Sequence, residues 1–137
     1  MKILATVLTA AMILTAGLVS TNKKTITATV VNVTSDSGKV SFALYNKDTF
    51  MKVPLQAKNA KIVDGKSTVV FEDVDAGDYA VICFHDKNDN DKMDFQENGM
   101  PLEDYGASNN VMSFGPPTYS NAKFTVSDKD VSLEIKF

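Results

Sequence analysis

The chain contains no arginine and no tryptophan, and only one cysteine and one histidine among its 137 residues. Arginine usually binds phosphate and guanine through paired hydrogen bonds, and a nucleic-acid-binding protein needs a positively charged surface. Here 14 lysines face 17 acidic residues, for a net charge of −3. We therefore expect no nucleic-acid partner. The lone cysteine, Cys83, cannot form an internal disulfide, and its apolar surroundings predict a buried, inert thiol.

The single histidine, His85, limits the catalytic chemistry that the sequence can support. A serine–histidine–aspartate triad would have to use it, and zinc sites usually need three or four His, Cys or carboxylate ligands. Catalysis by a pair of carboxylates is not excluded by composition, because residues 72–104 contain 11 acidic residues and only two lysines. With no other catalytic grouping, we predict that the protein is not an enzyme. The alternative is a hydrolase of an extracellular polysaccharide or ester that uses carboxylates of residues 86–104.

The chain begins with a long apolar run, residues 3–19, which follows Met-Lys and precedes small and polar residues. This pattern is typical of a secretory signal peptide, residues 1–20, with cleavage between residues 17 and 22. The alternative is an uncleaved membrane anchor, because about 17 apolar residues can just span a bilayer. Export to the periplasm or the extracellular space is the expectation, with membrane contact only through an uncleaved signal segment.

Beyond the apolar run, β-branched and aromatic residues alternate with polar ones at a period of two. The pattern predicts one all-β domain, residues 21–137, with a long loop region at 86–121. We expect an immunoglobulin-like or transthyretin-like two-sheet antiparallel β-sandwich of about seven strands. The clearest strands are predicted at 25–33, 39–45, 66–71 and 79–84, with a final pair at 122–126 and 131–137 around a turn.

Residues 86–97 read D-K-N-D-N-D-K-M-D-F-Q-E, which places oxygen-bearing side chains at positions 1, 3, 5, 9 and 12 of a twelve-residue calcium loop. Ca²⁺ prefers six to eight oxygen ligands, and a loop of this spacing presents alternate side chains inward. The pattern predicts an EF-hand-like Ca²⁺ site in a β setting. Its ligands would be the side chains of Asp86, Asn88, Asn90, Asp94 and Glu97 and the backbone carbonyl of Lys92.

A plain polar turn is the competing interpretation of the same segment, because Asp and Asn favour turns and bond their own backbone amides. Turn chemistry alone does not require a glutamate at position 12. Position 6, where glycine is usual, is Asp91, and aspartate enters the left-handed region at a cost of about 1 kcal/mol.

Three segments of the chain form a specific combination: G-D-Y-A-V-I-C-F-H-D-K-N-D-N-D-K-M-D at 77–94, G-M-P-L-E-D-Y-G-A-S-N-N at 99–110 and F-G-P-P at 114–117. Together they resemble the DUF2141 family of bacterial exported proteins. The resemblance implies an exported domain of the bacterial cell envelope without an assigned activity. Residues 69–82 also resemble the hairpin of transthyretin-like and carboxypeptidase-regulatory-like modules, which supports the sandwich but not a function.

A second cluster lies in the long region after the acidic loop. Its aromatic and amide side chains suggest a recognition loop for a sugar or peptide ligand, with Tyr105, Asn109, Asn110 and Tyr119 as the contacts. The competing interpretation is structural: Tyr105 anchors a long crossover while the two asparagines satisfy its backbone. Taken together, the sequence predicts a non-enzymatic exported β-sandwich with one Ca²⁺ loop, structural or ligand-binding in the envelope.

Overall fold

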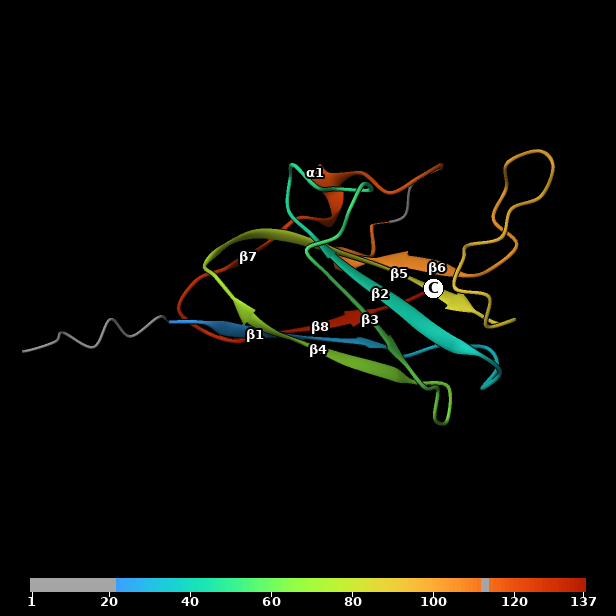
Figure 1. The fold of residues 1–137 in the computed structure, drawn as a ribbon, viewed down its shortest axis with the longest axis horizontal. Coiled ribbons are helices and arrows are strands. Elements are labelled where there is room, and N and C mark those ends of the chain that lie inside the picture. Colours follow the sequence, from blue (N-terminus) through green and yellow to red (C-terminus); the bar gives the residue numbers. More distant parts are fainter. Residues whose placement is uncertain (1–21, 112–113) are drawn as a thin grey trace, which may run out of the picture.

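The computed structural model describes residues 22–111 and 114–137, and β-strands dominate this part of the chain (Figure 1). The predicted signal peptide, residues 1–20, lies outside the described residues. No helix of the described part is long and apolar enough to cross a membrane. In chain order the elements are β1 (Lys24–Val30), β2 (Lys39–Tyr45), β3 (Gln56–Ala60), β4 (Ser67–Val74), β5 (Gly77–Asp86), β6 (Tyr105–Ala107), the 3₁₀ turn η1 (Ser108–Asn110), α1 (Tyr119–Ala122), β7 (Phe124–Val126) and β8 (Val131–Ile135).

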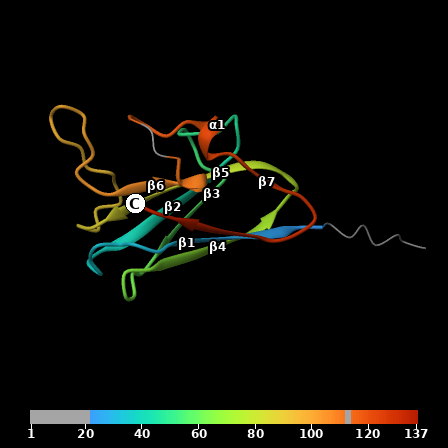
Figure 2. The same cartoon turned by 180° about the vertical axis from the view of Figure 1, so that it is seen from behind.

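The strands form two sheets that enclose one hydrophobic core (Figures 1 and 2). One sheet has the order β4-β1-β8 and the other the order β3-β2-β5-β6, while β7 pairs with the first residues of β5. The predicted all-β, two-sheet sandwich is confirmed, with eight strands in the described residues instead of about seven.

The core forms because alternate residues of each strand face the opposite sheet. In β2 the alternate residues Val40, Phe42 and Leu44 are buried, and Phe71 of β4 faces them from the other sheet. Cys83 is also fully buried in this core, as expected. Burial raises the pKa of its thiol well above the ordinary value of 9.0, so the thiol stays protonated.

The last two strands do not pair with each other, so the predicted terminal hairpin is wrong. Strand β7 runs antiparallel to the start of β5, with Gly77 opposite Val126. Strand β8 instead runs parallel to β1, with Ile26 opposite Val131. The four residues 127–130 therefore cross from one sheet to the other. Period-two patterning indicates a strand but not its partner, and here Val126 and Ile135 each bury their side chains in the shared core.

Strand β3, residues 56–60, is mostly polar. It forms the edge of the larger sheet beside β2. Its side chains reach the neighbouring edge of β4: Gln56 Nε2 donates to the Glu72 carbonyl at 2.8 Å and Lys58 Nζ to the Val70 carbonyl at 2.5 Å. These contacts cover an open strand edge, which would otherwise be available for pairing with another chain.

Strand β5 connects two polar regions of the molecule. It is the longest strand, ten residues, and at about 3.3 Å per residue its ends lie about 30 Å apart. Its first residues lie near α1 and β7, whereas its last residue leads into segment 87–104, which projects from the opposite end of the molecule (Figure 1).

Candidate metal centre

The predicted loop begins at Asp86, the last residue of β5, whose side chain is fully buried. Its Oδ1 accepts a hydrogen bond from the backbone amide of Asn90 at 3.1 Å, and its Oδ2 accepts one from the amide of Asp91 at 2.8 Å. One carboxylate thus folds the chain back on itself within five residues. The left-handed backbone expected at position six is present, with φ of 63° at Asp91, and Asp89 is also left-handed at 58°.

Three of the predicted ligands converge beyond this turn. Asn88 Nδ2 donates to Asp94 Oδ2 at 2.8 Å, and Asn90 Nδ2 donates to Asp94 Oδ1 and Oδ2 at 2.9 and 3.1 Å. The two amide groups therefore meet one carboxylate at a single point. Because an amide can turn over about its last side-chain bond, the same positions can present either N–H donors or carbonyl oxygens there.

Glu103 holds the two ends of the loop together, and sequence reasoning did not identify it. Its Oε2 accepts from the amide of Lys87 at 2.8 Å and its Oε1 from the amide of Asp94 at 3.0 Å. The carboxylate therefore joins loop positions 2 and 9. A hollow of about 480 Å³ lies beside it, lined by Asn88, Asp94, Glu103 and the apolar side chains of Phe95 and Leu102.

The structure does not bring Glu97 to the other predicted ligands. Residues 95–101 form a small hairpin: Phe95 bridges to Pro101, and the Gln96 amide donates to the Met100 carbonyl at 2.7 Å. Glu97 is exposed in its turn. Lys92, the expected carbonyl ligand, is exposed, and its amide donates to Asn90 Oδ1 at 3.0 Å. The carboxylate that the fold presents to the loop is that of Glu103.

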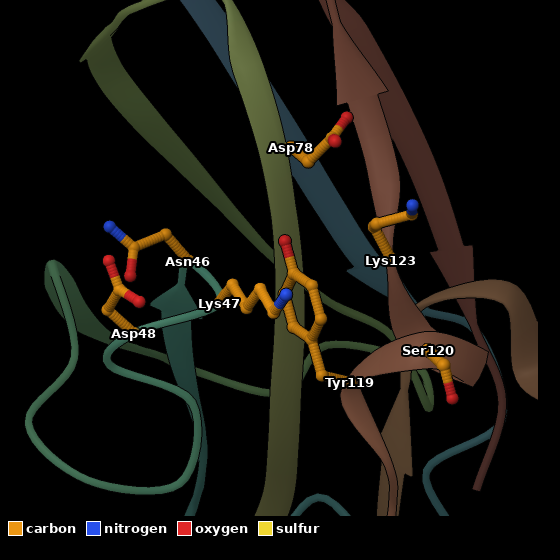
Figure 3. Close-up of a pocket in the computed structure, with 7 residues that line it drawn as sticks. All are labelled: Asn46, Lys47, Asp48, Asp78, Tyr119, Ser120 and Lys123. Atoms are coloured by element: carbon orange, nitrogen blue, oxygen red, sulfur yellow. The ribbon is translucent and has the colours of Figure 1, made fainter.

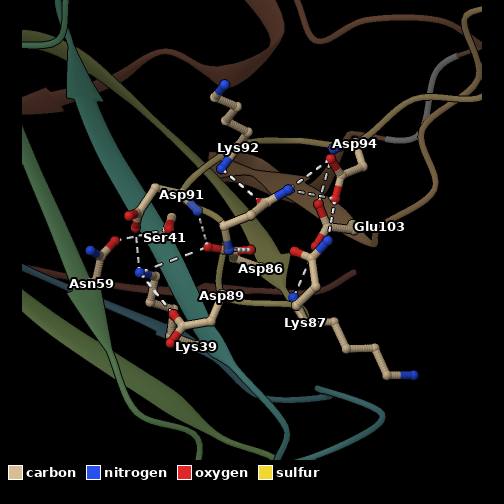
Figure 4. A network of polar contacts seen from close by, with 12 residues as sticks. Lys39, Ser41, Asn59, Asp86, Lys87, Asp89, Asp91, Lys92, Asp94 and Glu103 are labelled. Atoms are coloured by element: carbon tan, nitrogen blue, oxygen red, sulfur yellow. Dashed lines mark hydrogen bonds and ion pairs between the residues drawn. The ribbon is translucent and has the colours of Figure 1, made fainter.

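Lys39 places a cation against the other side of the loop (Figure 4). Its Nζ lies 2.9 Å from Asp89 Oδ1 and 3.8 Å from Asp86 Oδ2, and it also forms an ion pair with Asp91. The hydrogen bonds to Asp91 and Asp89 raise the pKa of Lys39 above its ordinary value of 10.5. This ammonium relieves part of the repulsion among the acids of the loop.

The loop also packs closely against the turn that precedes β2. Gly38, with φ of 72°, approaches so closely that a Cβ there would lie 2.1 Å from the Asp86 carbonyl oxygen. His85, buried beside it, holds the same turn through a 2.7 Å hydrogen bond between its Nε2 and the Ser37 carbonyl. The lone histidine thus has a structural contact in this position.

The predicted recognition residues Asn109 and Asn110 are occupied by backbone groups. Asn109 Nδ2 donates to the carbonyls of Asn121 and Lys123 at 2.9 and 2.8 Å. Asn110 Nδ2 donates to the Glu134 carbonyl at 2.9 Å, and its Oδ1 accepts from the Lys136 amide at 2.8 Å. These bonds favour the structural interpretation of both residues: they clamp the crossover onto α1 and β8.

Ser108 completes this clamp from the buried side. It is only 1% exposed, its Oγ accepts from the Val81 amide at 3.1 Å, and its hydroxyl donates to the Ala122 carbonyl. The remaining two predicted contacts differ from each other. Tyr105 reaches the Gly115 carbonyl at 3.5 Å, at the limit of a hydrogen bond. Tyr119, by contrast, lines a separate hollow at the other end of β5.

The chemistry available to a cation at the loop is that of mixed oxygen donors. Among residues 22–111 and 114–137, no group of three or more histidine, cysteine, aspartate or glutamate side chains lies close enough to hold a metal ion. A cation would therefore need amide and backbone carbonyl oxygens beside the carboxylates. Ca²⁺ accepts such a set, whereas zinc prefers nitrogen and sulfur. The donor set at Asn88, Asn90 and Asp94 fits Ca²⁺ in kind.

For three residues of this region, no sequence pattern predicts their contact with the loop. Glu103 lies nine positions beyond Asp94 and reaches the loop only because the intervening hairpin folds back. Lys39 reaches it because the register of β2 and β5 sets Lys39 opposite Asp86. Gly38 is a turn glycine whose close approach to the loop depends on the same register.

One family model matches residues 28–134, and its description is "Uncharacterized protein conserved in bacteria (DUF2141)". No curated protein and no solved structure matches the chain. The matched range reaches from β1 into β8 and includes the loop, Glu103 and the Ser108–Asn110 clamp. The chain therefore belongs to the DUF2141 family.

Proposed function

We propose that this DUF2141 domain is a non-enzymatic, exported module of the bacterial cell envelope, structural or ligand-binding, whose 86–94 loop binds one Ca²⁺ ion. The observation that carries the proposal is the convergence of Asn88 and Asn90 on Asp94, at 2.8 to 3.1 Å. Two amide N–H groups approach one carboxylate there, which is where a cation between three oxygen-bearing side chains would lie. The apolar run at residues 3–19 supports export.

Ca²⁺ binding at this point requires two amide groups to turn over. The Asn90 amide would give up the hydrogen bond from the Lys92 amide, and both amides would direct oxygen toward the ion. Asp94 would exchange two amide donors for a divalent cation. With one carboxylate at the centre of the donor set, we expect a weak site, in the range of extracellular modules, about 10⁻⁴–10⁻³ M. Such a site stabilises the folded loop without acting as a sensitive signal.

Calorimetric titration of the metal-free protein with CaCl₂ tests the proposal, with Asp94→Ala as the variant that removes the shared ligand. Asp128→Ala is the matched control, because it removes the same carboxylate from the exposed turn between β7 and β8. We expect one ion per chain for wild type and control, and at least a tenfold weaker interaction for Asp94→Ala. Ca²⁺ at ten times its dissociation constant would then stabilise the fold by about 1.4 kcal/mol.

Mg²⁺ provides a second comparison, since it demands near-octahedral geometry and loses its water reluctantly. We expect it to bind more weakly than Ca²⁺ at a loop of mixed donors. The proposal fails if wild type and Asp94→Ala give the same heat, or if Ca²⁺ leaves the unfolding temperature unchanged at 10 mM.

A carboxylate-dependent hydrolase is the second candidate, because Asp94 and Glu103 line one hollow beside Phe95 and Leu102. Glycoside hydrolysis needs one carboxyl group that carries a proton and a second that is free to attack or to activate water. Both oxygens of Glu103 already accept backbone amides, and both oxygens of Asp94 accept side-chain amides. Both carboxyl groups are therefore occupied as hydrogen-bond acceptors, which supports the binding role over the catalytic one.

A further inference from the structure

A second hollow, of about 490 Å³, lies at the opposite end of β5, beside α1 (Figure 3). Small-molecule sites commonly have volumes of about 300–1,000 Å³. Three segments far apart in the sequence form this hollow: the connection after β2, the first residues of β5, and α1 with the residue that follows it. The side chains used below are Asn46, Lys47, Asp48, Asp78, Tyr119 and Lys123.

The hollow has a rigid aromatic surface. Tyr119 lies at its centre, with its hydroxyl toward the side of Asp78 (Figure 3). Its ring packs edge-to-face on Phe50 with centroids 5.6 Å apart, and Phe50 packs in the same way on the buried Tyr45 at 5.8 Å. This row of three rings runs from the core to the surface and fixes the orientation of Tyr119. An aromatic face held in this way is prepared for a ligand at little entropic cost.

Hydrogen bonds within the protein fix two further walls. The amide of Asn46 donates to Thr49 Oγ1 at 3.0 Å, and the amide of Thr49 donates to Asn46 Oδ1 at 2.9 Å. Asp78 Oδ1 accepts from the Thr125 hydroxyl at 2.7 Å, which leaves its second oxygen for another donor. The connection after β2 and the first residues of β5 therefore keep their shape without a ligand.

The charges around the hollow balance. Lys47 and Lys123 provide two positive charges, and Asp48 and Asp78 provide two negative ones. An anion site would need an excess of donors and positive charge, and a cation site an excess of acids. Burial, followed by the charges of Asp78 and Asp48, raises the pKa of Tyr119 above 10.0, so its hydroxyl stays protonated and can donate. Balanced charge with both donors and acceptors suits a neutral, hydroxyl-rich molecule.

We propose that this hollow binds a neutral saccharide unit, with the C–H face of the sugar ring against Tyr119. The sugar hydroxyls donate to the carboxylates of Asp48 and Asp78 and accept from the ammonium groups of Lys47 and Lys123. This site is separate from the calcium loop and does not depend on it, because the two lie at opposite ends of β5. Tyr119 was predicted from the sequence as a ligand contact. The other residues of the hollow lie on segments that only the fold brings together.

The test is a titration of the ¹⁵N-labelled protein followed by two-dimensional NMR, with maltotriose, cellotriose and chitotriose as neutral probes. Trigalacturonate and spermidine serve as the anionic and cationic comparators. We expect at least one neutral trisaccharide to shift the amide signals of residues 46–48, 78 and 119–123, and to leave those of the 86–94 loop unchanged. The charged comparators should cause no shift in the same residues at the same concentration.

Variants then assign the interaction to these side chains. Asp48→Ala removes an exposed carboxylate without touching the core and should weaken binding about tenfold, the cost of a hydrogen bond to a charged group. Tyr119→Phe keeps the ring and its packing on Phe50 and should lose less affinity than Tyr119→Ala. Asp128→Ala is the matched control, because it removes the same carboxylate from an exposed turn that does not line the hollow, and it should bind like wild type.

Several results would overturn the proposal. They are the absence of shifts with all three neutral trisaccharides, shifts only with trigalacturonate or spermidine, shifts that cluster away from Tyr119, or equal affinity of Asp48→Ala and wild type. An Asn88→Ala protein separates this proposal from the calcium loop. It should keep wild-type saccharide affinity, whether or not the loop binds Ca²⁺.

Discussion

The two ends of β5 carry polar clusters that are built on opposite principles. At the end marked by Asp86, each carboxylate and side-chain amide of residues 86–94 is engaged by another group of the protein: backbone amides, other side chains of the loop or the ammonium of Lys39. At the end marked by Asp78, the charges of Lys47, Asp48 and Lys123 surround an open hollow. The first end is closed and holds its own shape, whereas the second leaves donors and acceptors for another molecule.

This difference shows why acidic composition alone is a poor guide to function. The loop has the clearer sequence pattern, yet most of the Asp and Asn side chains in that pattern form hydrogen bonds that fold the chain back on itself. A group that already accepts two good hydrogen bonds has little left for a ligand unless the ligand replaces those bonds. The hollow beside α1 has a weak sequence signal, but its groups remain available. Substitutions at each end of β5 test this difference.

The largest effect is expected where the closed end depends on close backbone approach. Gly38→Ala places a Cβ 2.1 Å from the Asp86 carbonyl oxygen at a residue with φ of 72°. Strain at positive φ and the forced movement of the loop together should lower the free energy of unfolding by about 4 kcal/mol. Urea denaturation measures the change.

Gly99→Ala is the matched control for this prediction. Gly99 also has positive φ, 83°, but a Cβ there meets nothing within 4 Å, so only the backbone strain remains, about 1 kcal/mol. Equal losses for the two variants would mean that contact with the turn before β2 does not support the loop, whose shape would then depend only on its own hydrogen bonds.

The sequence predicts the fold to the extent that alternation and burial decide it. Strand β2 was predicted at its observed bounds, and its inward set Val40, Phe42 and Leu44 is buried. Partner choice was not predictable, because Val131 reaches β1 through a crossover that no local pattern records. The same limit applies to the sites. The turn at Asp86 could be predicted from spacing along one segment, whereas Lys39 depends on register between strands.

An intermediate effect on stability should distinguish the structural asparagine Asn109 from the proposed calcium ligand Asn88, when each is replaced by aspartate. Asn109→Asp replaces an amide donor with a carboxylate that faces the carbonyls of Asn121 and Lys123. It should cost about 2 kcal/mol of stability for two lost hydrogen bonds, with or without Ca²⁺. Asn88→Asp sets a second carboxylate beside Asp94. It should cost about 1 kcal/mol without the ion and recover that loss in 10 mM CaCl₂.

Thermal unfolding of both variants, with and without Ca²⁺, gives the four values needed for this comparison. A calcium-dependent recovery of Asn109→Asp would place that residue at a cation site and contradict its role as a clamp. An Asn88→Asp protein that stays destabilised in CaCl₂ would count against the loop as a calcium site and leave it as a polar turn.

The smallest effect concerns the ammonium that neutralises part of the closed end. Since bonds to Asp91 and Asp89 raise the pKa of Lys39 above 10.5, the folded chain holds this proton more tightly than the unfolded chain. The stabilisation is therefore complete below about pH 10 and is lost as the pH rises through the folded pKa. Lys39→Gln should show a shallower decline of stability between pH 10 and pH 12 than wild type, and 1 M NaCl should reduce the difference because exposed ion pairs are screened. Lys129→Gln, in the exposed turn 127–130, should keep the wild-type slope; if it flattens the decline as much as Lys39→Gln does, the effect belongs to net charge and not to the loop.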